Sequence, residues 1–211
     1  MRPYRPLRSV ATFLLLVATA PAVRAEESAA DVAARGLEQC EEGRASSDRS
    51  TRESLFRSGQ MLGERAVALD DNSADAHFAI VCNLGELMRL DGERISSVLE
   101  LRRLLSELDR TLALNPDHVK AMATKGILLC RLPRLLGGDA VQGEQMLRRV
   151  VAEDPTAVNS RLVLAKQCAS RGVHDEALQY ASRALQIARE QGRADAVAEA
   201  QATLAQLGSA H

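Results

Sequence analysis

Residues Arg161–Ala188 read RLVLAKQCASRGVHDEALQYASRALQIA, two runs in which apolar side chains recur three and four positions apart. Such spacing places apolar side chains on one face of a helix. Gly172 separates the two runs and favours a turn between them. Small side chains recur in both runs, where two antiparallel helices must approach: Ala165, Ala177, Ala181 and Ala184. The stretch therefore predicts a helical hairpin.

This hairpin resembles the tetratricopeptide repeat (TPR), whose pattern combines a large residue, Leu-Gly, a second large residue, then Ala, an aromatic and a final Pro. Leu164 and Ala165 fill the Leu-Gly pair, and Ala177 matches the alanine of the second helix. Three positions depart from the pattern by replacing the second large residue, the aromatic and the proline: Cys168, Ala181 and Arg189. The hairpin therefore matches the TPR pattern in the spacing of its positions, but only in part in the residue types that fill them.

The pattern recurs toward the N-terminus at growing intervals. One repeat length of 34 residues leads back from Ala184 to Val150, and further steps of 39 and 45 residues lead to Thr111 and Ala66. The longest step exceeds the repeat by 11 residues, or about three helical turns. Such an insertion lengthens a hairpin while keeping its apolar face aligned, so we expect enlarged hairpins in the first part of the chain.

We therefore predict an all-α protein, an α-solenoid of about four TPR-like helical hairpins plus a C-terminal capping helix. The expected first helices of the pairs are Ala29–Glu41, Ala74–Leu90, Val119–Leu132 and Ala157–Arg171. The expected second helices are Thr51–Leu69, Glu93–Leu114, Ala140–Ala152 and Asp175–Gln191, and the capping helix is Ala194–Leu207.

The first 25 residues have the composition of a cleavable signal peptide. Three arginines precede the apolar run Val10–Ala20, and small residues around Ala25 offer a cleavage site. The run is shorter than the roughly 20 residues that a membrane-spanning helix needs, which disfavours a retained anchor. We expect residues 1–25 to be removed on export to the periplasm or the medium. Residues 26–211 then form a single TPR-like domain without an integral membrane segment.

The expected mature chain is mildly acidic, with 23 Lys and Arg against 28 Asp and Glu once the four arginines of the leader are removed. Nucleic-acid binding needs a clustered positive surface, and single strands also need aromatic platforms for their bases. The only aromatic residues of the mature chain are Phe56, Phe78 and Tyr180. These features exclude nucleic acid as the expected partner.

Two helix starts carry capping signals. Ser50 and Glu53 have the spacing of a capping box, in which each side chain satisfies a backbone donor near the other. Asp139 and Gln142 have a related spacing. We expect a second helix to begin at each of these pairs.

The stretch LPRLLGGD, Leu132–Asp139, predicts an enlarged corner between two helices. Pro133 ends or kinks the first helix, and Gly137 with Gly138 permits the backbone angles of a tight turn. A phosphate loop is the alternative, but Asp139 would place a negative charge against the phosphate.

The four cysteines fall one to each expected first helix: Cys40, Cys82, Cys130 and Cys168. Buried thiols at repeated inward positions are one interpretation. Export also permits disulfides, for which four cysteines allow three pairings that the sequence does not distinguish. A metal site is disfavoured because no Cys-x-x-Cys or His-x-x-x-His spacing occurs.

The histidines give no sign of catalysis. His77 occupies a large-residue packing position of its helix, His118 and His174 fall at turns where capping or solvation is expected, and His211 ends the chain. The sequence has no glycine-rich phosphate loop, activated serine or metalloprotease motif. We therefore expect no enzyme, no cofactor and no metal.

The resemblance implies a concave groove lined by the first helices, which would bind a protein or peptide partner. The family pattern places these residues on it: Phe78, Cys82, Glu86, Lys120, Thr124, Ile127, Arg131, Asn159, Leu162, Val163, Lys166 and Ser170. In the alternative, several of them pack against neighbouring helices. We predict a noncatalytic exported scaffold that buries apolar side chains of its partner and adds a few polar contacts.

A second hypothesis belongs to another class of protein. Irregular unit lengths and the sequence LLGGD before a second helix are similar to the periplasmic T-component proteins associated with TRAP transporters, over about Ala74–Glu190. Members of that family are commonly lipid-anchored, whereas no cysteine lies at the expected cleavage point. This resemblance implies an accessory component of solute uptake, which binds a small apolar ligand or the transport machinery.

Overall fold

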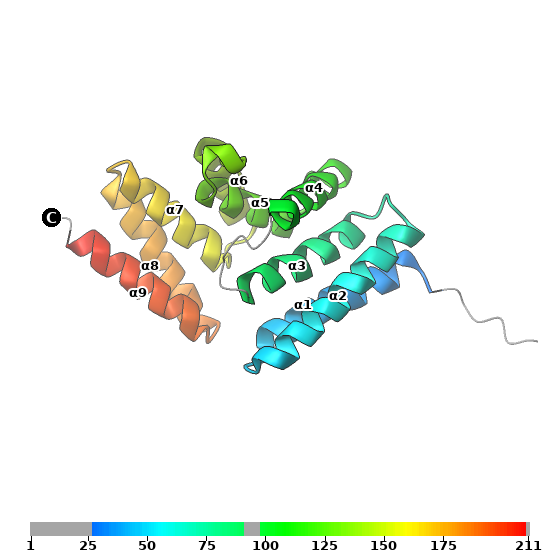
Figure 1. The fold of residues 1–211 in the computed structure, drawn as a ribbon. Coiled ribbons are helices and arrows are strands. Elements are labelled where there is room, and N and C mark those ends of the chain that lie inside the picture. The colour runs from blue at the N-terminus through cyan, green and yellow to red at the C-terminus, as the bar shows by residue number, and fades with distance from the viewer. Residues whose placement is uncertain (1–26, 91–97, 210–211) are drawn as a thin grey trace, which may run out of the picture.

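The computed structural model describes residues 27–90 and 98–209, and within these ranges it contains helices and turns but no strand. The first helices are α1 (Ala29–Ala45), α3 (Ala74–Leu90), α5 (Val119–Arg131) and α7 (Val158–Ser170). The second helices are α2 (Arg49–Leu69), α4 (Val98–Leu114), α6 (Ala140–Glu153) and α8 (His174–Glu190), and α9 (Ala194–Gly208) follows. Figure 1 shows the hairpins around an arc with α1 and α9 at its ends. The predicted all-α solenoid is confirmed.

Three predictions fall on residues outside the described ranges. They concern the expected leader at residues 1–25, the start of the predicted helix at residues 93–97, and His211. Within the described part of the chain, none of the helices combines the length and the apolar character needed to cross a membrane.

The second helices bury the four positions that the repeat spacing aligns. Ala66, Thr111, Val150 and Ala184 are each at most 1% exposed. Thr111 also donates its hydroxyl to the carbonyl oxygen of Glu107 at 2.8 Å, which satisfies its polar group inside the core. The predicted enlargement is confirmed in the first hairpin, where α2 has 21 residues, against 14 in α6.

The corner between α5 and α6 is built as predicted. The short 3₁₀ helix Arg134–Leu136 follows Pro133, and Gly137 adopts a φ of 90°, a conformation that favours glycine. A Cβ atom at Gly138 would lie 1.8 Å from the carbonyl oxygen of Leu132, so only glycine fits there. Asp139 then caps α6, accepting hydrogen bonds from the backbone N–H groups of Val141 and Gln142.

The predicted capping box at the start of α2 is wrong. The helix begins at Arg49, and its cap is Asp48, which accepts a hydrogen bond from the backbone N–H of Thr51 at 2.7 Å. Ser50 therefore lies inside the first turn, and Glu53 pairs with Arg57 instead. The earlier start is favoured because a carboxylate stabilises the positive end of the helix dipole.

The sequence left open whether the four cysteines are buried thiols or form disulfides, and the structure contains one disulfide and two free thiols. Cys40 on α1 and Cys82 on α3 form a disulfide with a Cα–Cα distance of 6.1 Å, while Cys130 and Cys168 are free thiols. Cys168 is buried and Cys130 is half-buried. The disulfide therefore joins the first hairpin to the second.

A polar network ties α6, α7 and α8 together. The guanidinium of Arg148 binds Glu144 through Nε at 2.9 Å, Glu176 through Nη2 at 2.9 Å and the hydroxyl oxygen of Tyr180 through Nη1 at 3.1 Å. Cys168 donates its thiol hydrogen to Glu176. Hydrogen bonding by Arg148 outweighs desolvation and lowers the pKa of Glu176 to about 2.

This lowered pKa predicts a specific loss of stability in acid. Glu176 has an ordinary pKa of 4.5, so its contribution is complete above that pH and disappears as the pH falls toward about 2. We expect the free energy of unfolding, measured by urea titration over this range, to fall less steeply in Glu176→Gln than in the native chain. Equal slopes for the two proteins would contradict the assignment.

Candidate binding cavity on the inner side of the arc

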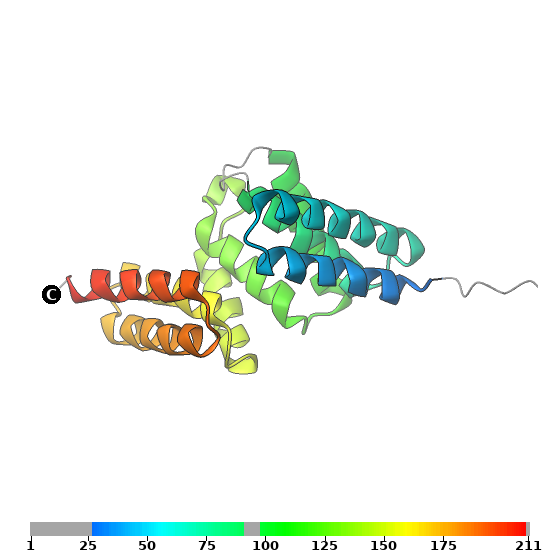
Figure 2. The same cartoon turned by 90° about the horizontal axis from the view of Figure 1, so that it is seen from below.

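A cavity of about 450 Å³ lies on the inner side of the arc. Its walls come from the end of α1, from α3, α4 and α5, and from the starts of α7 and α9. Figure 2 shows the molecule from below. In this view the first hairpin, α1 and α2, and the last helix, α9, lie on opposite sides of the helices in the middle of the arc. The cavity opens because α3 and α5 approach each other less closely than α1 and α3 do.

One wall of the cavity is apolar. Phe78 and Val81 on α3 and Leu104 on α4 belong to one buried cluster, against which Met88 and Leu128 pack. All five side chains also line the cavity. Phe78, Val81 and Leu104 are buried, whereas Met88 and Leu128 keep part of their apolar surface open to water. Such exposure is unfavourable by about 25 cal/mol per Å², so this wall favours an apolar occupant.

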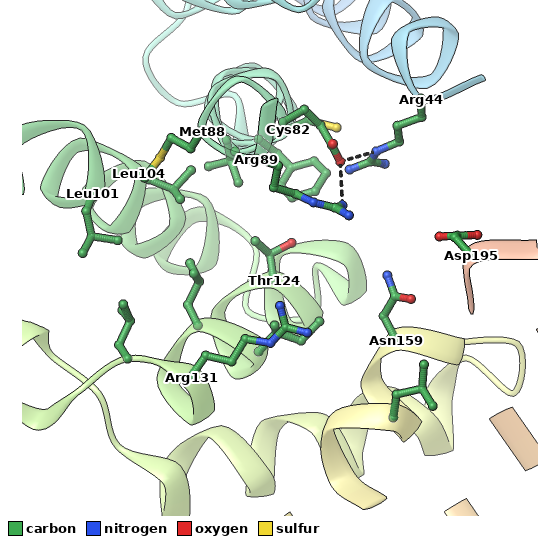
Figure 3. A pocket seen from close by; sticks show the side chains of 18 of the residues that line it. Arg44, Cys82, Met88, Arg89, Leu101, Leu104, Thr124, Arg131, Asn159 and Asp195 are labelled. Carbon is green, nitrogen blue, oxygen red and sulfur yellow. Dashed lines mark hydrogen bonds and ion pairs between the residues drawn. The ribbon is translucent and has the colours of Figure 1, made fainter. Parts of the chain in front are cut away.

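The opposite part of the cavity is charged. Glu86 on α3 has a side chain only 5% exposed, and its Oε1 accepts a hydrogen bond from Nε of Arg44 at 2.8 Å. Nη1 of Arg89 lies 3.5 Å from the same oxygen. Figure 3 shows Arg44 and Arg89 meeting this carboxylate, with Arg131 facing them from α5. A buried carboxylate is tolerable here because cations compensate for its desolvation.

The start of α9 completes this charged side. Arg193 donates from Nη2 to the side-chain oxygen of Asn159 at 3.2 Å and to Asp195 at 3.3 Å. Burial opposes ionisation of Asp195, but the backbone N–H of Ala196 and the charge of Arg193 together lower its pKa. Asp195 is therefore ionised at neutral pH and neutralises Arg193.

The structure brings most of the predicted groove residues to this cavity. Those that line it are Phe78, Cys82, Glu86, Thr124, Ile127, Arg131, Asn159 and Leu162. The other predicted residues lie elsewhere: Lys120 pairs with Glu41, Lys166 with Glu199, Ser170 donates to the carbonyl oxygen of Gln167, and Val163 is buried beside Leu147. A binding role for any of them stays a prediction.

Several lining residues were missed by the sequence reasoning. Leu101 and Leu104 lie on α4, a second helix, which the family pattern does not place on the groove. Arg44 and Arg89 could have been found, because each occupies the last turn of a first helix, as the predicted Arg131 does. Arg44 and Arg89 are 45 residues apart, the same spacing as Ala66 and Thr111, which indicates equivalent positions in the first two hairpins.

His77, His118 and Cys168 are engaged away from the lining of the cavity. His77 bonds through its two ring nitrogens to Glu107 and to the carbonyl oxygen of Asp71, as its predicted packing role requires. His118 accepts from the backbone N–H of Ala121 and caps α5. Burial and the carboxylate of Glu176 raise the pKa of the Cys168 thiol, which disfavours a nucleophilic thiolate. No group of metal-ligating side chains occurs among the residues described.

Comparisons with known proteins place the chain among helical repeat structures of the TPR kind. The solved structure of TTC0263, a thermophilic TPR protein of Thermus thermophilus, matches with a TM-score of 0.54 at 19% identity, covering 84% of this chain and 99% of the other. At this identity the likeness concerns the fold, and it confirms the TPR resemblance.

Two structures of MamA also match. One is a double mutant of MamA RS-1, with a TM-score of 0.48 at 15% identity, covering 82% of this chain and 96% of the other. The second has a TM-score of 0.45 at 16% identity, covering 78% and 92%. No family model matches the sequence, and the search of curated proteins returned no match.

Proposed function

We propose that this chain is an exported, noncatalytic scaffold that binds a segment of a protein partner on the inner side of its arc. The observation that carries the proposal is the cavity of about 450 Å³, which six helices build together on that side. Its apolar wall offers burial, and Thr124, Asn159 and the arginines offer directional hydrogen bonds. Extended and helical peptides are recognised by this combination.

Export is the second part of the proposal. It is supported by the composition of residues 1–25 and by the Cys40–Cys82 disulfide, because disulfides persist in oxidising compartments. The periplasm and the medium are both such compartments. Fractionation of cells that express the full-length chain tests this part. We expect the processed protein outside the cytoplasm, and an unprocessed cytoplasmic protein would contradict it.

Partner binding is tested by affinity purification of the mature chain from the cell envelope fraction, with quantitative mass spectrometry. In Thr124→Trp an indole would fill the cavity, and we expect it to lower the recovery of the partner at least fivefold. The matched control is Arg183→Gln, at an exposed position of α8 outside the lining. Equal recovery with the Thr124 and Arg183 variants would contradict the proposed site.

The volume of the cavity supports a second candidate, the accessory component of solute uptake with a small ligand. A volume of about 450 Å³ falls within the roughly 300–1,000 Å³ typical of small-molecule pockets. Native mass spectrometry of the protein purified from its own cells tests this candidate. A bound molecule of a few hundred daltons would support it, and the bare chain mass in every preparation would count against it.

A further inference from the structure

Two cross-links join α1 to α3 beside the cavity. The first is the Cys40–Cys82 disulfide, and in the second Nε of Arg44 donates to Oε1 of Glu86 at 2.8 Å. Arg44 follows Cys40 by four residues on α1, and Glu86 follows Cys82 by four residues on α3. Four residues are about one helical turn, so the ion pair lies one turn beyond the disulfide on the same faces of both helices. Because α1 ends at Ala45, these cross-links hold its last turns.

One of the two cysteines borders the cavity. Cys82 is among the residues that line it and is 6% exposed, whereas Cys40 is fully buried and does not line it. Both share a buried cluster with Phe56 of α2, which lies outside the lining. Figure 3 shows Cys82 and Arg44 on the same side of the cavity. The cavity is therefore a route from solvent to Cys82.

This access gives thiol–disulfide exchange a defined order. A thiolate of a small dithiol attacks Sγ of Cys82, a bond between Cys82 and the reductant forms, and the bond between Cys82 and Cys40 breaks. Cys40 leaves as a thiolate and takes a proton from solvent. The second thiol of the reductant then attacks the reductant sulfur of the mixed disulfide, and Cys82 leaves and is protonated in turn. The protein gains two electrons as two thiols, and the dithiol loses two electrons as a cyclic disulfide.

Loss of the disulfide leaves the end of α1 weakly held. The remaining cross-link near this end is the pair of Arg44 with Glu86, and the side chain of Arg44 is 43% exposed, so water screens much of the attraction. The start of α1 stays attached, because Val32 and Ala33 are buried in a cluster shared with α2 and α3. Reduction is therefore expected to release the last turns of α1, and with them Arg44 of the cavity lining.

We propose that the Cys40–Cys82 disulfide is a redox switch of the cavity. A small dithiol reduces it through the cavity, and the reduced chain loses the fixed position of Arg44 and with it affinity for the partner. The coupling is reciprocal, because an occupant that binds the oxidised cavity more tightly also stabilises the oxidised state. The effect on the partner rests on the proposed function, whereas access to Cys82 does not.

Access through the cavity is tested by reducing the folded, oxidised mature chain with dithiothreitol. Free thiols are alkylated at successive times and counted by mass spectrometry. In Thr124→Trp the indole fills the cavity, so the rate of reduction should fall at least about fivefold, because exchange depends on access to the sulfur. Arg183→Gln on α8 is the matched control and should be reduced at the rate of the native chain.

Two outcomes of this experiment would overturn the route. One is an equal rate for the Thr124 and Arg183 variants. The other is a rate that rises steeply with urea below the unfolding transition, because the sulfur would then be reached by unfolding and not through the cavity.

A monothiol identifies the sulfur that is attacked. The oxidised chain is treated briefly with β-mercaptoethanol, the free thiols are alkylated, and the adducts are mapped by peptide mass spectrometry. We expect mercaptoethanol on Cys82 and the alkyl group on Cys40. The opposite assignment, or an even mixture of the two, would overturn the proposed order of exchange.

The effect on binding is measured by the envelope purification with quantitative mass spectrometry. Cys40→Ala/Cys82→Ala, purified without reductant, should recover the partner at least about fivefold less than the oxidised native chain, the lower end of typical coupling between two sites. Cys130→Ala is the matched control, at a free thiol outside the cavity lining. Circular dichroism of the double variant should retain the helical signal of the native chain at the temperature of the purification.

Equal recovery by the double variant and the native chain would overturn the switch. Loss of the helical signal would also overturn it, because the disulfide would then support the whole fold and not the end of α1. The reduction rates use purified protein and no partner, so failure to find a partner leaves them as measured. Recovery of the partner by both chains overturns the switch and leaves the proposed binding site intact.

Discussion

Gly59→Ala is expected to lower the free energy of unfolding by about 3 kcal/mol. A Cβ atom at Gly59 on α2 would lie 2.3 Å from Oδ1 of Asn83, 2.5 Å from its Cγ and 2.6 Å from its Nδ2. Asn83 on α3 is fully buried, and its Nδ2 donates to the carbonyl oxygens of Gly36 and Ala79 at 2.8 and 2.9 Å. The amide would have to move and release these bonds.

The magnitude follows from three contributions. Overpacking of a core costs typically 1–3 kcal/mol, and each buried hydrogen bond that is lost costs about 1 kcal/mol. Alanine recovers about 1 kcal/mol through its better helix propensity. Urea denaturation followed by circular dichroism measures the net change.

The control is Gly85→Ala in the middle of α3. There the nearest atom to an added Cβ is Cδ1 of Leu104 at 3.9 Å, which is ordinary contact. The same substitution should therefore raise the free energy of unfolding by about 1 kcal/mol through helix propensity. Equal effects at Gly59 and Gly85 would show that α2 and α3 do not pack as described.

Loss of the Cys40–Cys82 disulfide is expected to lower the free energy of unfolding by about 3 kcal/mol. The two cysteines are 42 residues apart, and loop-closure entropy for such a separation gives about 4 kcal/mol as an upper value. For a chain of this size the melting temperature should fall by roughly 10 °C. The double variant Cys40→Ala/Cys82→Ala should melt like the reduced native chain.

Two measurements test this pairing. Thiol titration of the unfolded, oxidised chain should find two thiols, from Cys130 and Cys168, and four after reduction. Cys130→Ala is the control, and its melting temperature should still respond to reductant. Four thiols before reduction, or a melting temperature unaffected by reductant, would contradict the bond between α1 and α3.

The repeat could be predicted because its signal is local periodicity. Ala66, Thr111, Val150 and Ala184 occupy matching positions in the second helices of successive hairpins, so burial at each follows from the stacking of similar hairpins. The corner at Leu132–Asp139 could also be predicted, because proline fixes its backbone angle and glycine permits angles that other residues avoid.

The cavity could be predicted only in part. The family pattern gives the inward face of α5 and α7, and Thr124 and Asn159 were found in this way. Leu101 and Leu104 were missed because α4 reaches the cavity only where α3 and α5 separate, and no local pattern encodes that separation. The pairing of Cys40 with Cys82 was also undecided, because it depends on how α1 lies against α3.

The central claim is that ligands bind in this cavity on the inner side of the arc. Photo-crosslinking tests it most directly, with benzoylphenylalanine placed at Thr124 in the cavity or at Arg183 on α8. We predict that the partner of the mature chain crosslinks from position 124 and not from position 183. Equal crosslinking from both positions, or crosslinking from position 183 alone, would contradict the claim.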